Sequence, residues 1–167
     1  MILEELKLKI PDLFEKVKRD VDKAIGRHRA GLSLGFVEMG VSNLGFIGGM
    51  FFSGGTIILM NSTVLKVLIN TETLSDDIII YYVYHILLHE YIHSLGFLNE
   101  KKCREVTNFV TKEVYEDQNH PARLLAERGI GYYFPKLIYA PGNYRLSSNI
   151  KIERIKNFDK SSQTYFA

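Results

Sequence analysis

The feature that most constrains the fold is a stretch of about twenty residues with the marks of one long, buried helix. Ser75 is a favourable N-cap residue, and the two aspartates that follow it suit the positive end of a helix dipole. Gly96 stands where a glycine commonly follows the last helical turn, so the helix is predicted to run from 76 to 95. Residues 78–88 are apolar nearly all round, which is typical of a helix covered on every side by other elements.

The last two turns of this helix carry His89, Glu90 and His93. Residues four apart share one face of a helix, about 6 Å apart at Cβ, so the two imidazoles can aim at one metal ion. Glu90 projects beside them, and a carboxylate there can take a proton from a metal-bound water and pass it to a leaving group. A buried carboxylate next to two histidines is also easier to explain with a cation between them. The pattern therefore indicates a metal site; the alternative is a buried helix whose histidines are satisfied by hydrogen bonds.

The sequence HEYIH at 89–93, followed by Gly96, resembles the short HExxHxxG motif of the zincin metallopeptidases. The resemblance implies a zinc-dependent peptidase, in which His89 and His93 bind Zn²⁺ and Glu90 is the general base for a metal-activated water. It also implies an α+β, zincin-like fold, with a small mixed sheet packed on a long active-site helix and a helical, loop-rich C-terminal part.

The third metal ligand is where the chain departs from both branches of that family. The metzincin branch has a His or Asp three residues after the glycine, where this chain has Asn99, and all four methionines precede the motif, so a Met-turn is missing. Glu100 resembles the glutamate ligand of the thermolysin-like branch, although that glutamate comes from farther along the next helix and the acid expected four residues later is Arg104 here. Glu100 is therefore predicted to be the third ligand beside the two histidines, with Asn99 and Cys103 as the alternatives.

Several other side chains near the motif have competing interpretations. The ladder from His85 to His93 rises about 12 Å, whereas a metal–nitrogen bond is about 2.1 Å, so one ion cannot take all three histidines. We interpret His85 as a core residue or a support for the ligands, with substrate contact as the alternative. A lone helical cysteine such as Cys103 is usually a small buried hydrophobe rather than a thiolate ligand. The candidate donors to a developing oxyanion are Tyr132, Tyr133, Tyr139, Tyr144 and Arg145, and the sequence does not choose among them.

The whole chain, 1–167, is predicted to form a single metallopeptidase-like domain. Its three parts are 1–74 with a helix, a sheet and an edge strand, 75–98 with the active-site helix and glycine turn, and 99–167 with C-terminal helices and a tail. The other predicted helices span 11–29, 64–69, 99–117 and 120–129, and the predicted strands span 32–38, 46–52 and 56–60.

Particular residues mark the ends of these elements. Pro11 is expected in the first turn of the first helix, and Gly31 at its end. His120 is expected to be a cap or loop residue, and 151–160 an exposed strand or frayed end.

Zincins bind extended substrates along a strand edge above the metal, and residues 56–61 are the candidate for that edge.

Charge and composition remove several classes of function. The 21 basic and 19 acidic residues leave a net charge of +2, which gives no electrostatic reason to expect nucleic acid or an anionic membrane as a partner. Residues 39–65 lack charge, but glycines and polar residues interrupt them, so no membrane span is predicted. One cysteine and the absence of a secretory signal favour a cytoplasmic protein. The expected partner is a peptide or protein substrate, and the sequence does not predict the oligomeric state.

Two other functions stay open on the sequence. The first is a different metal-dependent hydrolase, because bacterial rRNA maturation endoribonucleases have a related two-histidine helix with a glycine turn, although the residue after their first histidine is usually glycine. The second is a non-catalytic, metal-stabilised binding protein, and its best support is Asn99 in the ligand position.

Overall fold

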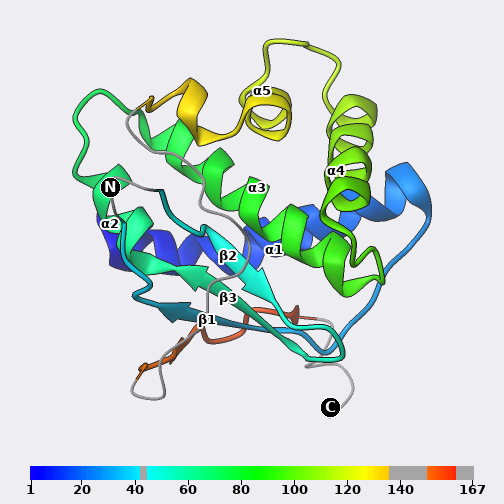
Figure 1. Ribbon diagram of the computed structural model, residues 1–167, viewed down its shortest axis with the longest axis horizontal. Helices are drawn as coiled ribbons and strands as arrows, with labels where there is room; N and C mark the ends of the chain where they lie inside the picture. The colour runs from blue at the N-terminus through cyan, green and yellow to red at the C-terminus, as the bar shows by residue number, and fades with distance from the viewer. Residues whose placement is uncertain (42–44, 136–149, 161–167) are drawn as a thin grey trace.

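The long helix predicted from the sequence is α3, Asp76–Ser94, which runs through the middle of the molecule (Figure 1). The computed structural model describes residues 1–41, 45–135 and 150–160. The Ser75 hydroxyl accepts a hydrogen bond from the backbone N–H of Ile78 at 3.4 Å, which confirms the predicted N-cap. Gly96 has a φ of 108°, a conformation that favours glycine, so the chain turns sharply just after α3 as expected.

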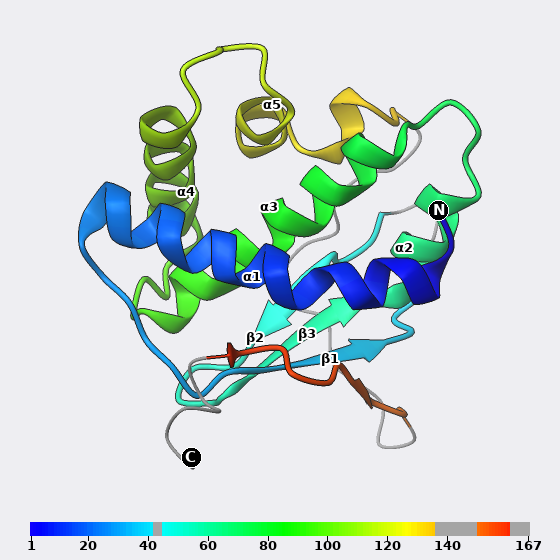
Figure 2. The ribbon, with the colours of Figure 1, turned by 180° about the vertical axis from the view of Figure 1, so that it is seen from behind.

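The first helix, α1, spans Leu3–Ile25 and crosses α3 on the side that faces the viewer in Figure 2. The prediction placed Pro11 in its first turn, but the buried face already begins at Leu6, and Pro11 lies inside the helix. Packing of that apolar face outweighs the backbone hydrogen bond that proline cannot donate. The predicted end at Gly31 is also wrong, because Gly26 adopts φ 66° and ends the helix there.

The sheet is small and mixed, as predicted, and its strand order is β2-β3-β1-β4 among the described residues. Its strands are β1, Ser33–Val37; β2, Gly49–Phe51; β3, Ile57–Asn61; and β4, Glu153–Arg154. β1 is parallel to β3, whereas β2 and β4 are antiparallel to their neighbours. The strand predicted over 46–52 is shorter than expected, because the Asn61 side chain, rather than a neighbouring strand, donates a hydrogen bond to the Ile47 carbonyl at 2.9 Å.

The edge strand next to α3 was assigned wrongly from the sequence. The predicted edge, 56–61, corresponds to β3, which lies between β2 and β1 and pairs with both. The outer strand that contacts α3 is β2. Strand order depends on pairing between distant segments, so the pattern of single strands could not reveal it.

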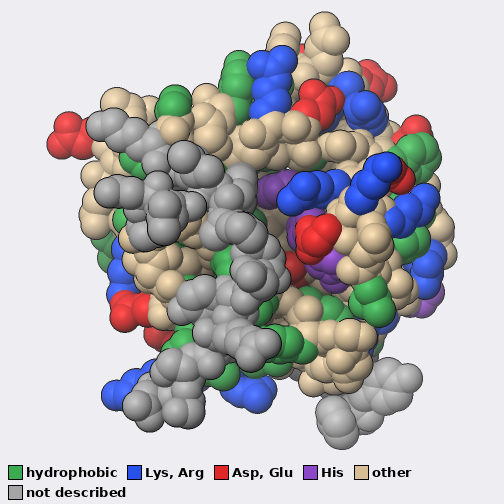
Figure 3. All heavy atoms as spheres, viewed as in Figure 1, with side chains coloured by type: hydrophobic (Ala, Val, Ile, Leu, Met, Phe, Trp, Pro, Cys, Tyr) green, Lys and Arg blue, Asp and Glu red, His purple; other side chains and the backbone are tan. Residues whose placement is uncertain are grey.

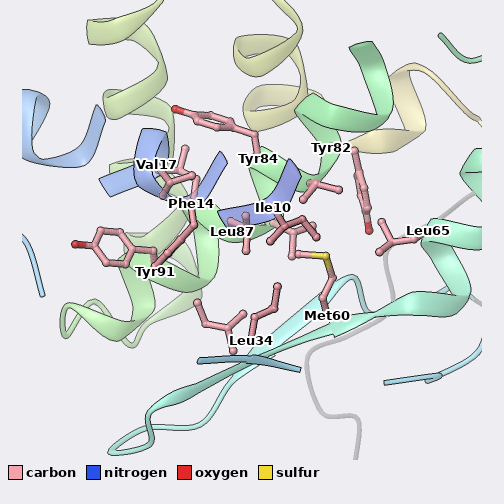
Figure 4. Close-up of a cluster of buried hydrophobic side chains, with 14 of the residues drawn as sticks. Ile10, Phe14, Val17, Leu34, Met60, Leu65, Tyr82, Tyr84, Leu87 and Tyr91 are labelled. Atoms are coloured by element: carbon pink, nitrogen blue, oxygen red, sulfur yellow. The ribbon is translucent and has the colours of Figure 1, made fainter. Parts of the chain in front are cut away.

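The hydrophobic core fills the space between α1, α3 and the sheet. Figure 4 shows ten of its side chains: Ile10, Phe14 and Val17 from α1, Leu34 from β1, Met60 from β3, Leu65 from α2, and Tyr82, Tyr84, Leu87 and Tyr91 from α3. The short helix α2, Ser62–Ile69, leaves β3 directly, and Asn61 caps it by accepting from the Thr63 N–H at 3.1 Å. These contacts fix α3 on its apolar side.

Two helices cover the opposite side of α3. They are α4, Glu100–Val114, and α5, Pro121–Arg128, and a 3₁₀ turn, η1, follows over Ile130–Tyr132. His120 caps α5, since its Nδ1 accepts from the Ala122 N–H at 3.1 Å, which confirms the expected cap. Within the described parts of the chain, none of the helices combines the length and apolar character needed to cross a membrane.

The exposed β4 confirms the exposed strand expected within 151–160, but the residues after it are anchored rather than frayed. Phe158 is buried and stacks on Phe14 with ring centroids 4.0 Å apart. Asp159 is buried as well, and one carboxylate oxygen accepts from Lys18 Nζ at 2.7 Å. Tyr139, Tyr144 and Arg145, three of the candidate oxyanion donors, lie outside the described residues.

Candidate metal centre

The turn at Gly96 brings the start of α4 beside the last two turns of α3, so that three predicted ligands meet. Glu100 Oε1 lies 2.7 Å from His93 Nε2, and Glu100 Oε2 lies 3.3 Å from His89 Nε2. The two imidazole rings are almost perpendicular, with centroids 4.8 Å apart. Hydrogen bonding from His89, supported by His93, lowers the pKa of Glu100 to about 2 against the opposing effect of burial. Glu100 is therefore an ionised carboxylate at neutral pH.

The hydrogen bonds of His93 indicate a positive charge between its ring and Glu100. His93 Nδ1 lies 2.7 Å from the Phe97 carbonyl oxygen, which can only accept, so Nδ1 carries a proton. In a neutral ring Nε2 then presents a lone pair, yet it faces a carboxylate oxygen at 2.7 Å. Two acceptors this close need a positive charge beside them, which a proton supplies at this distance and a bound metal ion would supply once the two groups move slightly apart. The donor set fits a divalent cation such as Zn²⁺.

The two alternatives for the third ligand differ in how they are engaged. Asn99 caps α4, because its side-chain oxygen accepts from the Lys102 N–H at 3.0 Å. Cys103 is buried, as predicted, and its Sγ and one ring nitrogen each from His89 and His93 lie within 4.8 Å of one another. Its thiol donates to the His89 carbonyl at 3.3 Å, and burial raises its pKa. Cys103 is thus the closer rival to Glu100, and Asn99 is occupied as a cap.

Glu90 lies deep beside this group. It is 4% exposed, and its Oε2 has no hydrogen-bond partner among the described residues. Burial, and then the charge of Glu100, raises the pKa of Glu90 to about 8. An unpartnered carboxylate oxygen is costly inside a protein, and a nearby cation or a bound polar molecule would reduce that cost.

Strand β2 reaches the helix through two glycines. A Cβ on Gly49 would lie 2.7 Å from Ile86 Cγ2 and 3.4 Å from Glu90 Cγ. A Cβ on Gly48 would lie 2.7 Å from Ile86 Cδ1. Only glycine lets the strand approach α3 this closely, so these two glycines, rather than those preceding β3, set the strand beside Glu90.

His89, Glu90, Glu100 and the two glycines line a cavity of about 440 Å³ that lies between β2, α3, α4 and α5 and opens to the surface. Figure 3 shows it as a hollow in which histidine side chains lie, with acidic and basic side chains around it. His85 lies on its wall rather than in the apolar core, and its Nδ1 is buried without a partner among the described residues. Burial, followed by the charges of His89 and Arg104, lowers the pKa of His85 to about 3, so its ring is neutral.

Two arginines that the sequence did not single out hold the end of α3. Arg27 Nη2 donates to the Leu95 carbonyl at 2.6 Å, and Arg29 Nη1 donates to the Ser94 carbonyl at 2.9 Å. The Arg27 guanidinium also lies 4.9 Å from the ring centroid of Phe97. They satisfy carbonyls that a helix leaves open at its C-terminus and so fix the turn next to His93. Their distance along the chain hides this role in the sequence.

No protein-family model, curated protein or solved structure matches this chain. The inference about its class therefore depends on the site itself. That site is a group of two histidines with a carboxylate or thiolate, beside a buried acid, in the wall of a cavity.

Proposed function

We propose that this protein is a zinc-dependent peptidase, in which His89, His93 and Glu100 hold Zn²⁺ and Glu90 is the general base. One observation supports this most strongly. His89, the ionised Glu100 and the buried Glu90, whose Oε2 has no partner among the described residues, line one cavity, and His93 contacts Glu100 from behind that wall. The HExxHxxG resemblance adds to it, because it assigns the same roles to the same positions. Cys103 is the alternative third ligand.

When bound, zinc supplies polarisation of the scissile carbonyl and lowers the pKa of a water molecule. The protein supplies the rest. A bound cation beside Glu90 would lower its raised pKa and keep the carboxyl group ionised. Glu90 would then take a proton from the attacking water at its free Oε2 and give it to the leaving amine. β2 is an outer strand of the described sheet, and it is the one that lies against α3, so an extended substrate backbone pairs with it beside Glu90.

The test is hydrolysis of an unstructured protein and a peptide library by the zinc-loaded natural protein and its Glu90→Gln variant. Glutamine keeps the size of the side chain but cannot act as a base, so turnover is expected to fall by about 10²- to 10⁴-fold while bound metal stays the same. Glu105→Gln is the matched control, because it removes an exposed carboxylate of α4 that does not line the cavity. Cleavage by Glu90→Gln at the natural rate would refute the mechanism.

A further inference from the structure

We propose that Arg104 and Arg128 form a subsite of this cavity that binds a carboxylate group of the substrate. The inference rests on the proposed peptidase function, because the bound molecule is taken to be the peptide substrate. The residues that form the subsite are different from the proposed metal ligands. Both arginines line the cavity, Arg104 from α4 and Arg128 from the end of α5. The substrate class that follows is a peptide with a carboxylate close to the bond that is cut.

Helix geometry places Arg104 one turn away from the candidate metal centre. Glu100 and Arg104 are four residues apart on α4, as His89 and His85 are on α3, so each pair shares a helix face with a separation of about 6 Å. The charge of Arg104 contributes to the lowered pKa of His85, which agrees with their being neighbours across the cavity. The His85–Arg104 pair therefore lies about one helical turn from the pair of His89 and Glu100.

The arginine donors are open to a ligand. Neither Arg104 nor Arg128 forms a hydrogen bond or salt bridge with any residue in the described part of the chain, and both are exposed at the cavity. The guanidinium of Arg128 lies 5.1 Å from the ring centroid of Tyr132, a contact that orients it. Glu127 also lines the cavity and is exposed, but it is not ion-paired with either arginine.

A carboxylate is the group that this arrangement suits. The planar guanidinium binds both carboxylate oxygens through two parallel hydrogen bonds. His85 adds a buried Nδ1 without a partner among the described residues, within the same wall. Arg104 lies one helical turn from Glu100, so the carboxylate that it binds belongs to a residue close to the reacting bond. It is either the C-terminal carboxylate or an acidic side chain.

The experiment compares three peptides of one sequence: a free C-terminal carboxylate, a C-terminal amide, and an amide with aspartate as the last residue. Their binding to zinc-loaded Glu90→Gln and to the metal-free natural protein is measured by isothermal titration calorimetry. The free acid is expected to bind about tenfold more tightly than the plain amide. The Asp peptide shows whether an acidic side chain provides the same gain.

Three variants assign the effect to the subsite. Arg104→Gln is expected to remove the tenfold gain and leave binding of the plain amide unchanged, and Arg128→Gln to reduce the gain. Glu127→Gln should raise affinity for the free acid, because it removes a repelling charge at the same cavity. Lys101→Gln, the matched control, removes a positive charge from α4 outside the cavity and should change nothing.

The outcomes separate the subsite from the proposed function. Equal binding of all three peptides, or a gain that survives Arg104→Gln, overturns the subsite and leaves the hydrolysis test standing. An Arg104-dependent gain without any hydrolysis by the natural protein overturns the peptidase and keeps the subsite. Arg104-dependent binding of an oligoribonucleotide, with no preference among the peptides, overturns the carboxylate in favour of a phosphate ligand.

Discussion

The face of α3 that packs against α1 and the face that lines the cavity treat buried polar atoms differently. On the first face these atoms have partners within the protein. The Tyr84 hydroxyl donates to Asp20 Oδ2 at 2.7 Å, and the Tyr91 hydroxyl accepts from the backbone N–H of Arg29 at 3.0 Å. This face holds α3 in place.

The cavity face leaves comparable atoms open. His85 Nδ1 and Glu90 Oε2 are buried, and neither has a hydrogen-bond partner in the described parts of the chain. Buried polar atoms left without protein partners at a cavity are suited to contact a ligand there. We therefore expect substitutions on the face that packs against α1 to change stability, and substitutions on the cavity face to change activity.

The largest effect on stability is expected from Leu87→Ala on the core face. Leu87 is fully buried, so its truncation leaves a cavity and should lower the free energy of unfolding by about 3 kcal/mol. Urea denaturation of the metal-free protein measures this loss. Hydrolysis per folded molecule should remain close to natural, and a folded variant that has lost its activity would break the division between the two faces.

A smaller loss is expected from Tyr84→Phe, which removes only the hydroxyl that donates to Asp20. Asp20 keeps its ion pair with Lys16, at 2.7 Å, so the cost should be about 1–2 kcal/mol in the same denaturation experiment. Tyr81→Phe is the control on the same helix, because the Tyr81 hydroxyl forms no hydrogen bond with a described residue. Equal losses in both variants would argue against the special role of the Asp20 contact.

The smallest effect comes from the titration of His85 on the cavity face. Its pKa is about 3 in the folded protein and about 6.5 when unfolded, so the unfolded chain binds one more proton between these values. Its contribution to stability is complete above pH 6.5 and falls below it by at most about 1.4 kcal/mol per pH unit. Denaturation of the metal-free protein at pH 5.5 and 7 should show this slope reduced in His85→Gln. Identical slopes would contradict the neutral state of His85.

The sequence predicted α3 and the proximity of His89, His93 and Glu100 well because their signals are local. Ser75, the apolar run and Gly96 lie within a single element, and Glu100 follows the second histidine by one tight turn. Chain connectivity alone keeps such residues close together. The spacing along the chain was therefore enough to predict that three side chains lie close together: His89, His93 and Glu100.

The rest of the site could not be predicted because it depends on contacts between distant segments. Gly48 and Gly49 come from a strand whose place in the sheet the sequence did not reveal, and Arg128 reaches the cavity from α5. Arg27 acts on the end of α3 from 68 residues away along the chain. Pro11 misled the prediction in the same way, because burial of α1 outweighed a local signal.

The most direct test of the central claim is metal content per chain, by elemental mass spectrometry, on protein purified without a metal-affinity tag. The natural sequence is compared with Glu100→Ala. The account predicts about one zinc per natural chain and its loss in the variant, as a site with three protein ligands requires. If the variant retains zinc, Cys103 rather than Glu100 would be assigned as the third ligand. No metal in the natural protein, even after zinc is added, would contradict the account.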